Sequence, residues 1–334
     1  MGTNDGRRIL VTGALGQIGT ELVISLRECF GNEYVISSDI DKLNEDGENI
    51  HLICDVTDKS AISVIIEEYN IGEIYHLAAL LSATGEKNPE LCYNVNMNGL
   101  LNVLELAKEY DLKVFAPSSI AVFGPDTPPI APQAYPLNPT TMYGITKVAG
   151  ELLADYYHRE HGVDVRGLRY PGLISWKMMP GGGTTDYAVE IFYEAIVNGK
   201  YTCFVESDTR LPMMYMDDAI RATLELMSAP LGSLSLHSNY NLGAMSFTAK
   251  ELAESIQKLV PDFEITYDPD YRQSYADSWP DSIDDTTARL DWGWEPQFDL
   301  EATTEIMLEN LRLKLTTKNK KIGIHSTPSS PDEE

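Results

Sequence analysis

The chain has 334 residues, of which 43% are apolar, and carries a formal net charge of −26 at pH 7. So large an acidic excess disfavours nucleic acid and anionic membranes as partners, because both are bound by clustered Lys and Arg. The sequence has no apolar run of about eighteen residues that would predict a membrane span, and its four cysteines lack the spacing of a disulfide framework or a metal site. A small molecule is therefore the expected partner.

Strand-like and helical patterns alternate through the first 120 residues. Apolar runs rich in Val, Ile and Leu predict strands at 8–13, 34–39, 49–56, 73–79 and 113–119. Patterns of helical period lie between them, at 18–29, 60–69 and 102–110. This alternation predicts an α/β fold with a doubly wound, Rossmann-type parallel sheet.

Three glycines mark the junction of the first strand and the first helix, in the spacing GxxGxxG: Gly13, Gly16 and Gly19. Glycines at such a junction let the chain turn sharply and let a pyrophosphate approach the N–H groups at the helix start. Asp39 ends the second strand, where a carboxylate accepts hydrogen bonds from both ribose hydroxyls and repels a 2′-phosphate. These features predict NAD rather than NADP, although Asp39 also fits a simple loop cap.

A tyrosine and a lysine open a later helical pattern, in "YGITK" at residues 143–147. Positions four apart share one helix face, so Tyr143 and Lys147 point into the same space. A nearby ammonium favours the phenolate and lowers the pKa of a phenol, which would make Tyr143 a general base. Ser118 and Ser119 end the preceding strand and supply hydroxyls that both donate and accept. Taken alone, the Tyr/Lys spacing is also common on solvated helix faces.

The pattern loosens after residue 170. A Pro/Gly-rich loop runs into a helix at 170–196, further helices are predicted at 215–229 and 248–261, and 276–297 is turn-rich and aromatic. We expect a dinucleotide-binding domain of residues 1–170 plus about 206–242. We expect a substrate-binding lobe of residues 171–205 plus about 243–315, and a polar, mobile tail at 316–334.

Five stretches, in this order, resemble the extended short-chain dehydrogenase/reductase superfamily: "TGALGQIG", "HLAA", "NVNMNG", "SSIAVFG" and "YGITK". The resemblance implies Tyr143 as base, Lys147 as its activator and Ser119, rather than Ser118, as the residue that orients the hydroxyl. It places Asn96 where it supports a proton relay, unless Asn96 only caps or kinks a helix. Asp55 and Val56 would meet the adenine, with solvated loop residues as the alternative. The implied cofactor-binding set is Gly13, Gly16, Gln17, Ile18, Gly19, Asp39, Asp55, Val56, Leu77, Ala78, Ala79, Asn96, Tyr143, Lys147 and Leu173.

Four longer stretches are similar to the short-chain type of L-threonine 3-dehydrogenase: residues 80–89, 168–195, 208–223 and 274–294. This resemblance implies an enzyme that oxidises L-threonine to 2-amino-3-oxobutyrate with NAD and without a metal. The histidines of "HREH", His158 and His161, have no further ligands beside them and read as solvated surface.

A small zwitterionic substrate needs donors for its carboxylate and an acceptor for its ammonium group. Thr184 and Thr185, with N–H groups at a helix start, can bind the carboxylate, and Asp186 can pair with the ammonium. The alternative is that these residues form a helix N-cap. Ser82 and Ser118 are further substrate candidates. Trp279 is either a lid over the substrate or an aromatic anchor for its loop.

Assembly and location follow from the resemblance alone. It implies a homodimer that pairs through the helix after "NVNMNG" and the helix carrying "YGITK". It implies a mitochondrial location, with a cytoplasmic location as the alternative. Two other functions compete with threonine oxidation: a nucleotide-sugar epimerase or dehydratase of the same superfamily, and a non-catalytic NAD binder. An intact Ser/Tyr/Lys set disfavours the non-catalytic binder, because pure binding needs no poised base.

Overall fold

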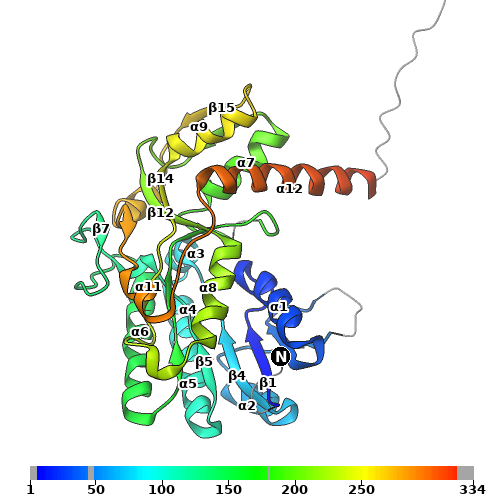
Figure 1. Cartoon of the computed structure of the whole chain (residues 1–334), viewed down its shortest axis with the longest axis vertical. Helices are drawn as coiled ribbons and strands as arrows, with labels where there is room; N and C mark the ends of the chain where they lie inside the picture. The colour runs from blue at the N-terminus through cyan, green and yellow to red at the C-terminus, as the bar shows by residue number, and fades with distance from the viewer. Residues whose placement is uncertain (1–5, 44–48, 180, 322–334) are drawn as a thin grey trace, which may run out of the picture.

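A computed structural model of the chain describes residues 6–43, 49–179 and 181–321 (Figure 1). Its main element is a six-stranded parallel sheet with the strand order β3-β2-β1-β4-β5-β8. The strands are β1 (Arg8–Thr12), β2 (Val35–Asp39), β3 (His51–Ile53), β4 (Ile71–His76), β5 (Lys113–Phe115) and β8 (Val165–Arg166). The predicted Rossmann-type fold is confirmed, and the strand order reverses between β1 and β4, where ligands of such folds bind.

Helices cover both faces of this sheet. On one face, α1 (Gln17–Phe30) and α8 (Met216–Ser228) pack over a core that includes Ile9 and Val11 of β1. On the other, α2 (Lys59–Tyr69), α5 (Gly99–Tyr110) and α6 (Met142–His161) pack over a core that includes Leu10. Neighbouring residues of β1 serve opposite cores because side chains alternate across a strand.

Short strands extend the structure beyond the main sheet. β6 (Ser118–Ser119), β9 (Leu168–Tyr170) and β13 (Tyr240–Asn241) form one three-stranded sheet. β10 (Gly172–Ile174), β12 (Arg210–Tyr215) and β14 (Met245–Thr248) form another. Two pairs complete the set: β11 (Lys200–Cys203) with β15 (Glu264–Tyr267), and β7 (Ile130–Ala131) with β16 (Ser282–Ile283).

A second apolar core lies at the end of the molecule away from the main sheet. There α7 (Tyr187–Val197), α9 (Ala249–Leu259) and α12 (Leu300–Lys321) surround β12 and β14 (Figure 1). Shorter helical elements are α3 (Ser82–Lys87), α4 (Pro89–Tyr93), η2 (Asn94–Asn98), η3 (Ile120–Val122), α10 (Gln273–Ala276) and α11 (Thr286–Trp292), with single turns η1 (Asn32–Tyr34) and η4 (Leu231–Ser233).

The C-terminal helix differs from the expectation. α12 continues to Lys321, so residues 316–321 of the expected tail are helical, because a polar segment can extend a helix that is already anchored by its apolar residues. The rest of the expected tail, 322–334, lies outside the described residues.

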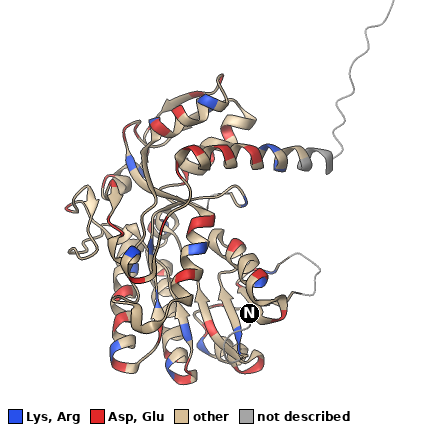
Figure 2. Cartoon of the chain, viewed as in Figure 1, with Lys and Arg blue, Asp and Glu red and all other residues tan. Residues whose placement is uncertain are grey.

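Acidic side chains occur on helices at both ends of the molecule (Figure 2). Among the described residues, no helix is long and apolar enough to cross a membrane. The same residues contain no cluster of three or more His, Cys, Asp or Glu that could hold a metal ion.

Candidate active site

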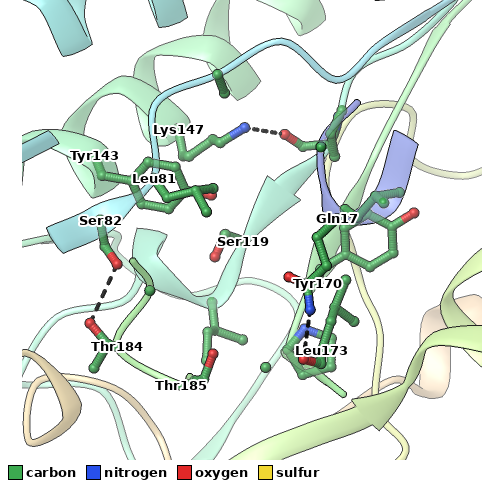
Figure 3. Close-up of a pocket in the computed structure, with 18 of the residues that line it drawn as sticks. Gln17, Leu81, Ser82, Ser119, Tyr143, Lys147, Tyr170, Leu173, Thr184 and Thr185 are labelled. Atoms are coloured by element: carbon green, nitrogen blue, oxygen red, sulfur yellow. Dashed lines mark hydrogen bonds between the residues drawn. The ribbon is translucent and has the colours of Figure 1, made fainter. Parts of the chain in front are cut away.

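A cavity of about 210 Å³ opens at the carboxyl ends of the main-sheet strands (Figure 3). Most of the predicted site residues line it: Gly13, Gly16, Gln17, Ile18, Gly19, Leu77, Ala79, Ser82, Ser118, Ser119, Tyr143, Lys147, Leu173, Thr184, Thr185, Asp186 and Trp279. Five predicted residues do not line it: Asp39, Asp55, Val56, Ala78 and Asn96. Segments far apart in sequence thus converge on one cavity, with the glycine turn at one end and the loop before α7 at the other.

The glycine turn at the start of α1 is packed too closely for side chains. Gly13 has φ +68°, and a Cβ added there would lie 2.5 Å from the backbone nitrogen of Ala78. A Cβ on Gly19 would overlap the carbonyl oxygen of Gly13. Gly16 is the N-cap of α1 and gives the first helical turn no side-chain cap. The turn therefore leaves N–H groups at a helix start beside the cavity, which is how a dinucleotide pyrophosphate is held.

Asp39 lies at the end of β2 beside this turn. Its Oδ2 accepts a hydrogen bond from Leu15 N at 2.9 Å, and its Oδ1 accepts one from Ile40 N at 2.8 Å. The carboxylate thus holds the glycine turn, as the loop-cap alternative predicts, and its contact with a ribose stays a prediction.

Asp55 and Val56 follow β3 and differ from each other. Asp55 is exposed and accepts hydrogen bonds from the N–H and hydroxyl of Thr57, at 2.9 and 2.8 Å. Val56 is buried, and its carbonyl accepts a hydrogen bond from Asn102 at 3.0 Å. The solvated alternative therefore fits Asp55 but not Val56.

The reaction centre is built by α6 and β6. Thr141 caps α6 by accepting a hydrogen bond from Gly144 N at 3.0 Å, and the first turn then places Tyr143 at the cavity. The ammonium of Lys147 lies 5.5 Å from the centroid of the Tyr143 ring and donates a hydrogen bond to Pro117 O at 2.7 Å. Ser119 faces the same space, between Tyr143 and Thr185 (Figure 3).

Burial dominates the titration of the two α6 side chains. It raises the pKa of Tyr143 to about 12, while a hydrogen bond with Ser119 acts in the opposite direction. Burial also lowers the pKa of Lys147 to about 8. The expected lowering of the Tyr143 pKa by Lys147 does not appear in this structure, where burial raises that pKa and the Lys147 ammonium donates to the Pro117 carbonyl.

The two serines of β6 have different surroundings. The Ser118 hydroxyl donates a hydrogen bond to the buried Glu151 carboxylate at 2.5 Å. The Ser119 hydroxyl accepts one from Ala121 N at 3.2 Å and hydrogen-bonds with Tyr143. Ser119 is thus the serine that can share a proton with Tyr143, whereas Ser118 is engaged away from it.

Asn96 lies in the π-helical turn η2 and faces the loop after β4. Its side chain accepts a hydrogen bond from Leu80 N at 2.8 Å and donates to Leu80 O and the Thr146 hydroxyl, both at 3.1 Å. This short π-helical turn allows Asn96 to fix a loop that lines the cavity, as π-bulges often do at functional sites.

The loop between β10 and α7 forms the other end of the cavity. Asp186 Oδ2 accepts hydrogen bonds from Gly182 N at 2.8 Å and Gly183 N at 2.7 Å. Burial raises the pKa of this carboxyl group, and the two N–H groups act against that rise. Asp186 stands at the N-cap position of α7, as the N-cap alternative predicts, but its side chain makes no cap hydrogen bond there. Its pairing with a substrate ammonium stays a prediction.

Ser82, Thr184 and Trp279 also line the cavity. The hydroxyls of Ser82 and Thr184 lie 3.4 Å apart (Figure 3). Trp279 is half-buried and packs against three apolar clusters while it also lines the cavity. It anchors its loop, and the lid role stays a prediction.

Several cavity residues have no clear signal in the sequence: Leu81, Pro117, Ile120, Tyr170, Pro171 and Gly172. They are apolar or backbone contributors, and their residue types are ordinary for strands and turns. Glu151 lines a smaller, separate cavity, and its position eight residues after Tyr143, two turns further along the same helix face, was a usable signal.

Comparisons with known proteins agree with this geometry. Residues 9–243 match the family described as "NAD dependent epimerase/dehydratase family". An uncharacterized epimerase/dehydratase of Staphylococcus aureus (strain MRSA252) is 49% identical over 318 residues, which cover 94% of this chain and 99% of the relative.

Two similar solved structures are threonine dehydrogenases. A monomeric L-threonine 3-dehydrogenase of metagenomic origin, in its apo form, is 61% identical with a TM-score of 0.90 and covers 92% of this chain and 99% of its own. An L-threonine dehydrogenase from Cupriavidus necator, in its holo form, is 53% identical with a TM-score of 0.89 and covers 91% and 99%. The glycine turn, the Tyr/Lys/Ser centre and these matches together place the chain in the NAD dependent epimerase/dehydratase family, among the extended short-chain dehydrogenases/reductases.

Proposed function

We propose that this enzyme oxidises the β-hydroxyl of L-threonine to give 2-amino-3-oxobutyrate, with NAD as the hydride acceptor. The observation that carries the proposal is the convergence of Tyr143, Lys147 and Ser119 on a cavity whose other end is the loop before α7. The solved threonine dehydrogenases support this substrate, since they cover 92% and 91% of the chain at 61% and 53% identity.

The family implies a nicotinamide cofactor, and the glycine turn fits one. The backbone packing at Gly13 leaves no room for a Cβ, and α1 begins without a side-chain cap, so N–H groups are available to a pyrophosphate. Asp39 beside the turn supports NAD over NADP, because its charge repels a 2′-phosphate. When bound, the dinucleotide supplies the acceptor for the hydride of the substrate carbinol.

The chain's own groups manage the substrate oxygen and its proton. The Ser119 hydroxyl can donate to the substrate oxygen, so it holds that oxygen as the alcohol becomes a ketone (Figure 3). Tyr143 takes the hydroxyl proton as the hydride leaves the carbinol carbon, and the Lys147 ammonium, 5.5 Å from the ring centroid, is placed to favour the phenolate that this step requires. One hydride and one proton leave the substrate, which balances the oxidation.

The substrate's charged groups fit the loop before α7. Thr184 and Thr185 offer hydroxyls at the cavity wall to a carboxylate, and Ser82 lies opposite Thr184. Asp186 offers its less engaged oxygen, Oδ1, to an ammonium, because both loop N–H groups bind Oδ2. These assignments support an amino acid rather than a nucleotide sugar as substrate.

Assembly and location belong to the same proposal. We propose a homodimer through α5 and α6, supported by exposed apolar residues on and beside them: Leu91, Tyr93, Leu101, Ile145, Leu152 and Tyr156. The metagenomic relative is described as monomeric and gives the dimer no support. The sedimentation coefficient of the pure protein will distinguish a dimer from a monomer. The Staphylococcus relatives are bacterial, so the expected mitochondrial location has no support from them and a cytoplasmic location is the one we propose.

The direct test follows NADH absorbance after the protein is mixed with NAD and L-threonine. L-serine, D-threonine and a UDP-sugar serve as parallel substrates. We expect NADH from L-threonine well above the other three. Conversion of the UDP-sugar without accumulation of NADH, and no reaction with L-threonine, would replace the proposal with an epimerase.

A further inference from the structure

One face of α6 contacts residues 117–119, the segment that contains β6, at three positions. The α6 positions are four residues apart, and their partners are three successive residues, in the pairs Tyr143 with Ser119, Lys147 with Pro117, and Glu151 with Ser118. Residues at such spacing lie one above another on a helix. The first two pairs belong to the proposed reaction centre, and the third has no role in it so far.

Glu151 is a buried carboxylate with a complete set of partners. Its Oε1 accepts hydrogen bonds from the Ser118 hydroxyl at 2.5 Å and from Arg169 Nε at 2.8 Å. Its Oε2 accepts one from Arg169 Nη2 at 2.7 Å, which completes a bidentate pair. The two side chains are 5% and 3% exposed.

Arg169 is itself fixed by the surrounding backbone. It comes from β9, the neighbour of β6, and its Nη1 donates to Gln133 O and Asn241 Oδ1, both at 3.1 Å. A buried ion pair is weak evidence for stability, because desolvation offsets most of its attraction. What the pair does provide is a fixed position for the Glu151 carboxylate and for the serine bound to it.

Glu151 and Lys147 both line a small cavity of about 30 Å³. It is large enough for one or two water molecules, and its wall also includes Ser118, Asn96 and His76. Burial lowers the pKa of Lys147, and the neighbouring Cys92 and Glu151 act in the opposite direction.

The other titratable groups near Lys147 are neutral around pH 8. They are Tyr143 on α6, His76 on β4 and Cys92 on α4. Burial raises the pKa of Tyr143 to about 12, raises that of Cys92, and lowers that of His76 to about 3. Arg169, on β9, is the other charged neighbour of this group and is paired with Glu151. Glu86, on α3, acts on Cys92, and Glu151 is the carboxylate that acts on Lys147 itself.

We propose that Glu151, held by Arg169, is a positioning residue of the reaction centre. It fixes the segment 117–119 against the face of α6 that carries Tyr143 and Lys147, and it places a negative charge behind the ammonium of Lys147. The role assigned to these residues rests on the proposed oxidation of threonine.

The first test is Glu151→Gln, which keeps the shape and removes the charge. We expect kcat with L-threonine to fall by on the order of a hundredfold, because a small displacement of reacting groups is enough for such a loss. The KM for NAD should change less than about twofold, since the glycine turn is untouched. The alkaline limb of the kcat profile should move to lower pH, because Lys147 loses its proton more readily beside an uncompensated Arg169.

A double variant separates positioning from stability. Glu151→Gln with Arg169→Gln removes both buried charges, so the free energy of unfolding should recover toward the wild-type value while kcat and the pH profile do not. Recovery of kcat together with stability would overturn the proposal and leave the pair a structural role.

A matched control is available in α8. Asp218 is fully buried, pairs with Arg221 at 2.7 Å and lies outside the cavity. Asp218→Asn should lower stability and leave the pH profile of kcat unchanged. A shift of that profile equal to the shift in Glu151→Gln would show that general destabilisation is the cause, against the proposal.

A substrate-independent measurement keeps this inference apart from the proposed function. The Lys147 signal in ¹³Cε-lysine NMR spectra is the one lost in Lys147→Arg, and its titration midpoint should be lower in Glu151→Gln than in the wild type. Equal midpoints would overturn the electrostatic role. A lower midpoint in a protein that makes no NADH from L-threonine would reject the proposed substrate and still support the placement of Glu151.

Discussion

Two glycine-rich segments meet at the cavity, and they are held in different ways. The turn at 13–19 is fixed mainly by backbone packing, since Gly13 has φ +68° and lies against the end of β4, and Asp39 adds one hydrogen bond from Leu15 N. The loop at 181–183 also contains a glycine of positive φ, Gly182 at +95°, but there the carboxylate of Asp186 holds two N–H groups. The first segment is held mainly by the packing of the sheet's own backbone, whereas in the second the two loop N–H groups both donate to one side chain.

The reaction centre lies between the two segments. Tyr143→Phe should therefore impair turnover without impairing the binding of either NAD or L-threonine. Removal of one hydroxyl leaves the ring in place, so NAD affinity and L-threonine affinity should stay within about threefold of the wild type. Turnover should fall by about a thousandfold, the scale of a lost acid–base group. NADH absorbance and NAD titration by fluorescence measure both quantities. Loss of NAD binding in this variant would mean that Tyr143 is structural.

Gly13→Ala tests the segment held by backbone packing. The φ of Gly13 alone costs an Ala about 1–2 kcal/mol, and the added Cβ would also meet Ala78 N at 2.5 Å. We expect NAD affinity to fall by on the order of a hundredfold, about 3 kcal/mol of binding, as the turn and β4 separate. Isothermal titration with NAD and a thermal melt give the two effects.

Gly162→Ala is the control for backbone strain. Gly162 ends α6 with φ +71° and has nothing within 4 Å of an added Cβ. This variant should lose similar stability from its φ and keep NAD affinity. If both variants bind NAD equally well, the close packing of the glycine turn is not what shapes the cofactor site.

The same contrast explains what the sequence could predict. The parallel sheet, the glycine turn and the helix face of Tyr143 and Lys147 follow from local periodicity and from residues a few positions apart. The partner of Glu151 could not be predicted in this way, because Arg169 reaches it from a strand 18 positions along the chain. The carboxylate of Asp186 was assigned to a substrate or a helix cap, and only the path of the loop reveals its two N–H partners.

The sequence predicted where Tyr143 and Lys147 lie better than it predicted their pKa values, for a physical reason. Sequence shows that Lys147 lies near Tyr143, but burial decides their pKa values, and burial depends on the whole fold. The same limit applies to residues 316–321, whose polar sequence gives no sign that α12 extends through them.

Lys147→Met should show how much stability the fold loses by burying the Lys147 ammonium. The ammonium is enclosed, although the residue as a whole is half-buried, and its pKa is lowered to about 8 from an ordinary 10.5. The folded state therefore binds fewer protons than the unfolded state between about pH 8 and 10.5, so wild-type stability rises with pH across that window. Below pH 8 the full cost of the buried charge is present.

The variant removes this cost together with the hydrogen bond to Pro117. We expect it to be more stable than the wild type at pH 7 by on the order of 2 kcal/mol, and to lose that advantage by about pH 10.5. Urea unfolding at several pH values measures the difference. A constant difference across the window would mean that Lys147 is not the group whose charge destabilises the fold.

Asp186→Asn tests the segment that depends on a side chain, and its effect should be the smallest of the four. The amide keeps the shape but weakens two hydrogen bonds to Gly182 and Gly183 that are assisted by the carboxylate charge. We expect the KM for L-threonine to rise roughly tenfold, equivalent to about 1.4 kcal/mol, with NAD affinity unchanged. Asp58→Asn is the matched control, because Asp58 also accepts from two backbone N–H groups but at the start of α2.

An inhibitor without an amino group separates the two roles of Asp186. If the carboxylate acts by holding the loop, the inhibition constant of 3-hydroxybutyrate should rise in Asp186→Asn by the same factor as the KM for L-threonine. If the carboxylate pairs directly with the substrate ammonium, 3-hydroxybutyrate has no partner to lose and its inhibition constant should stay constant. An equal rise would assign the loop role and extend the comparison, because one carboxylate would then do for the substrate end what backbone packing does for the cofactor end.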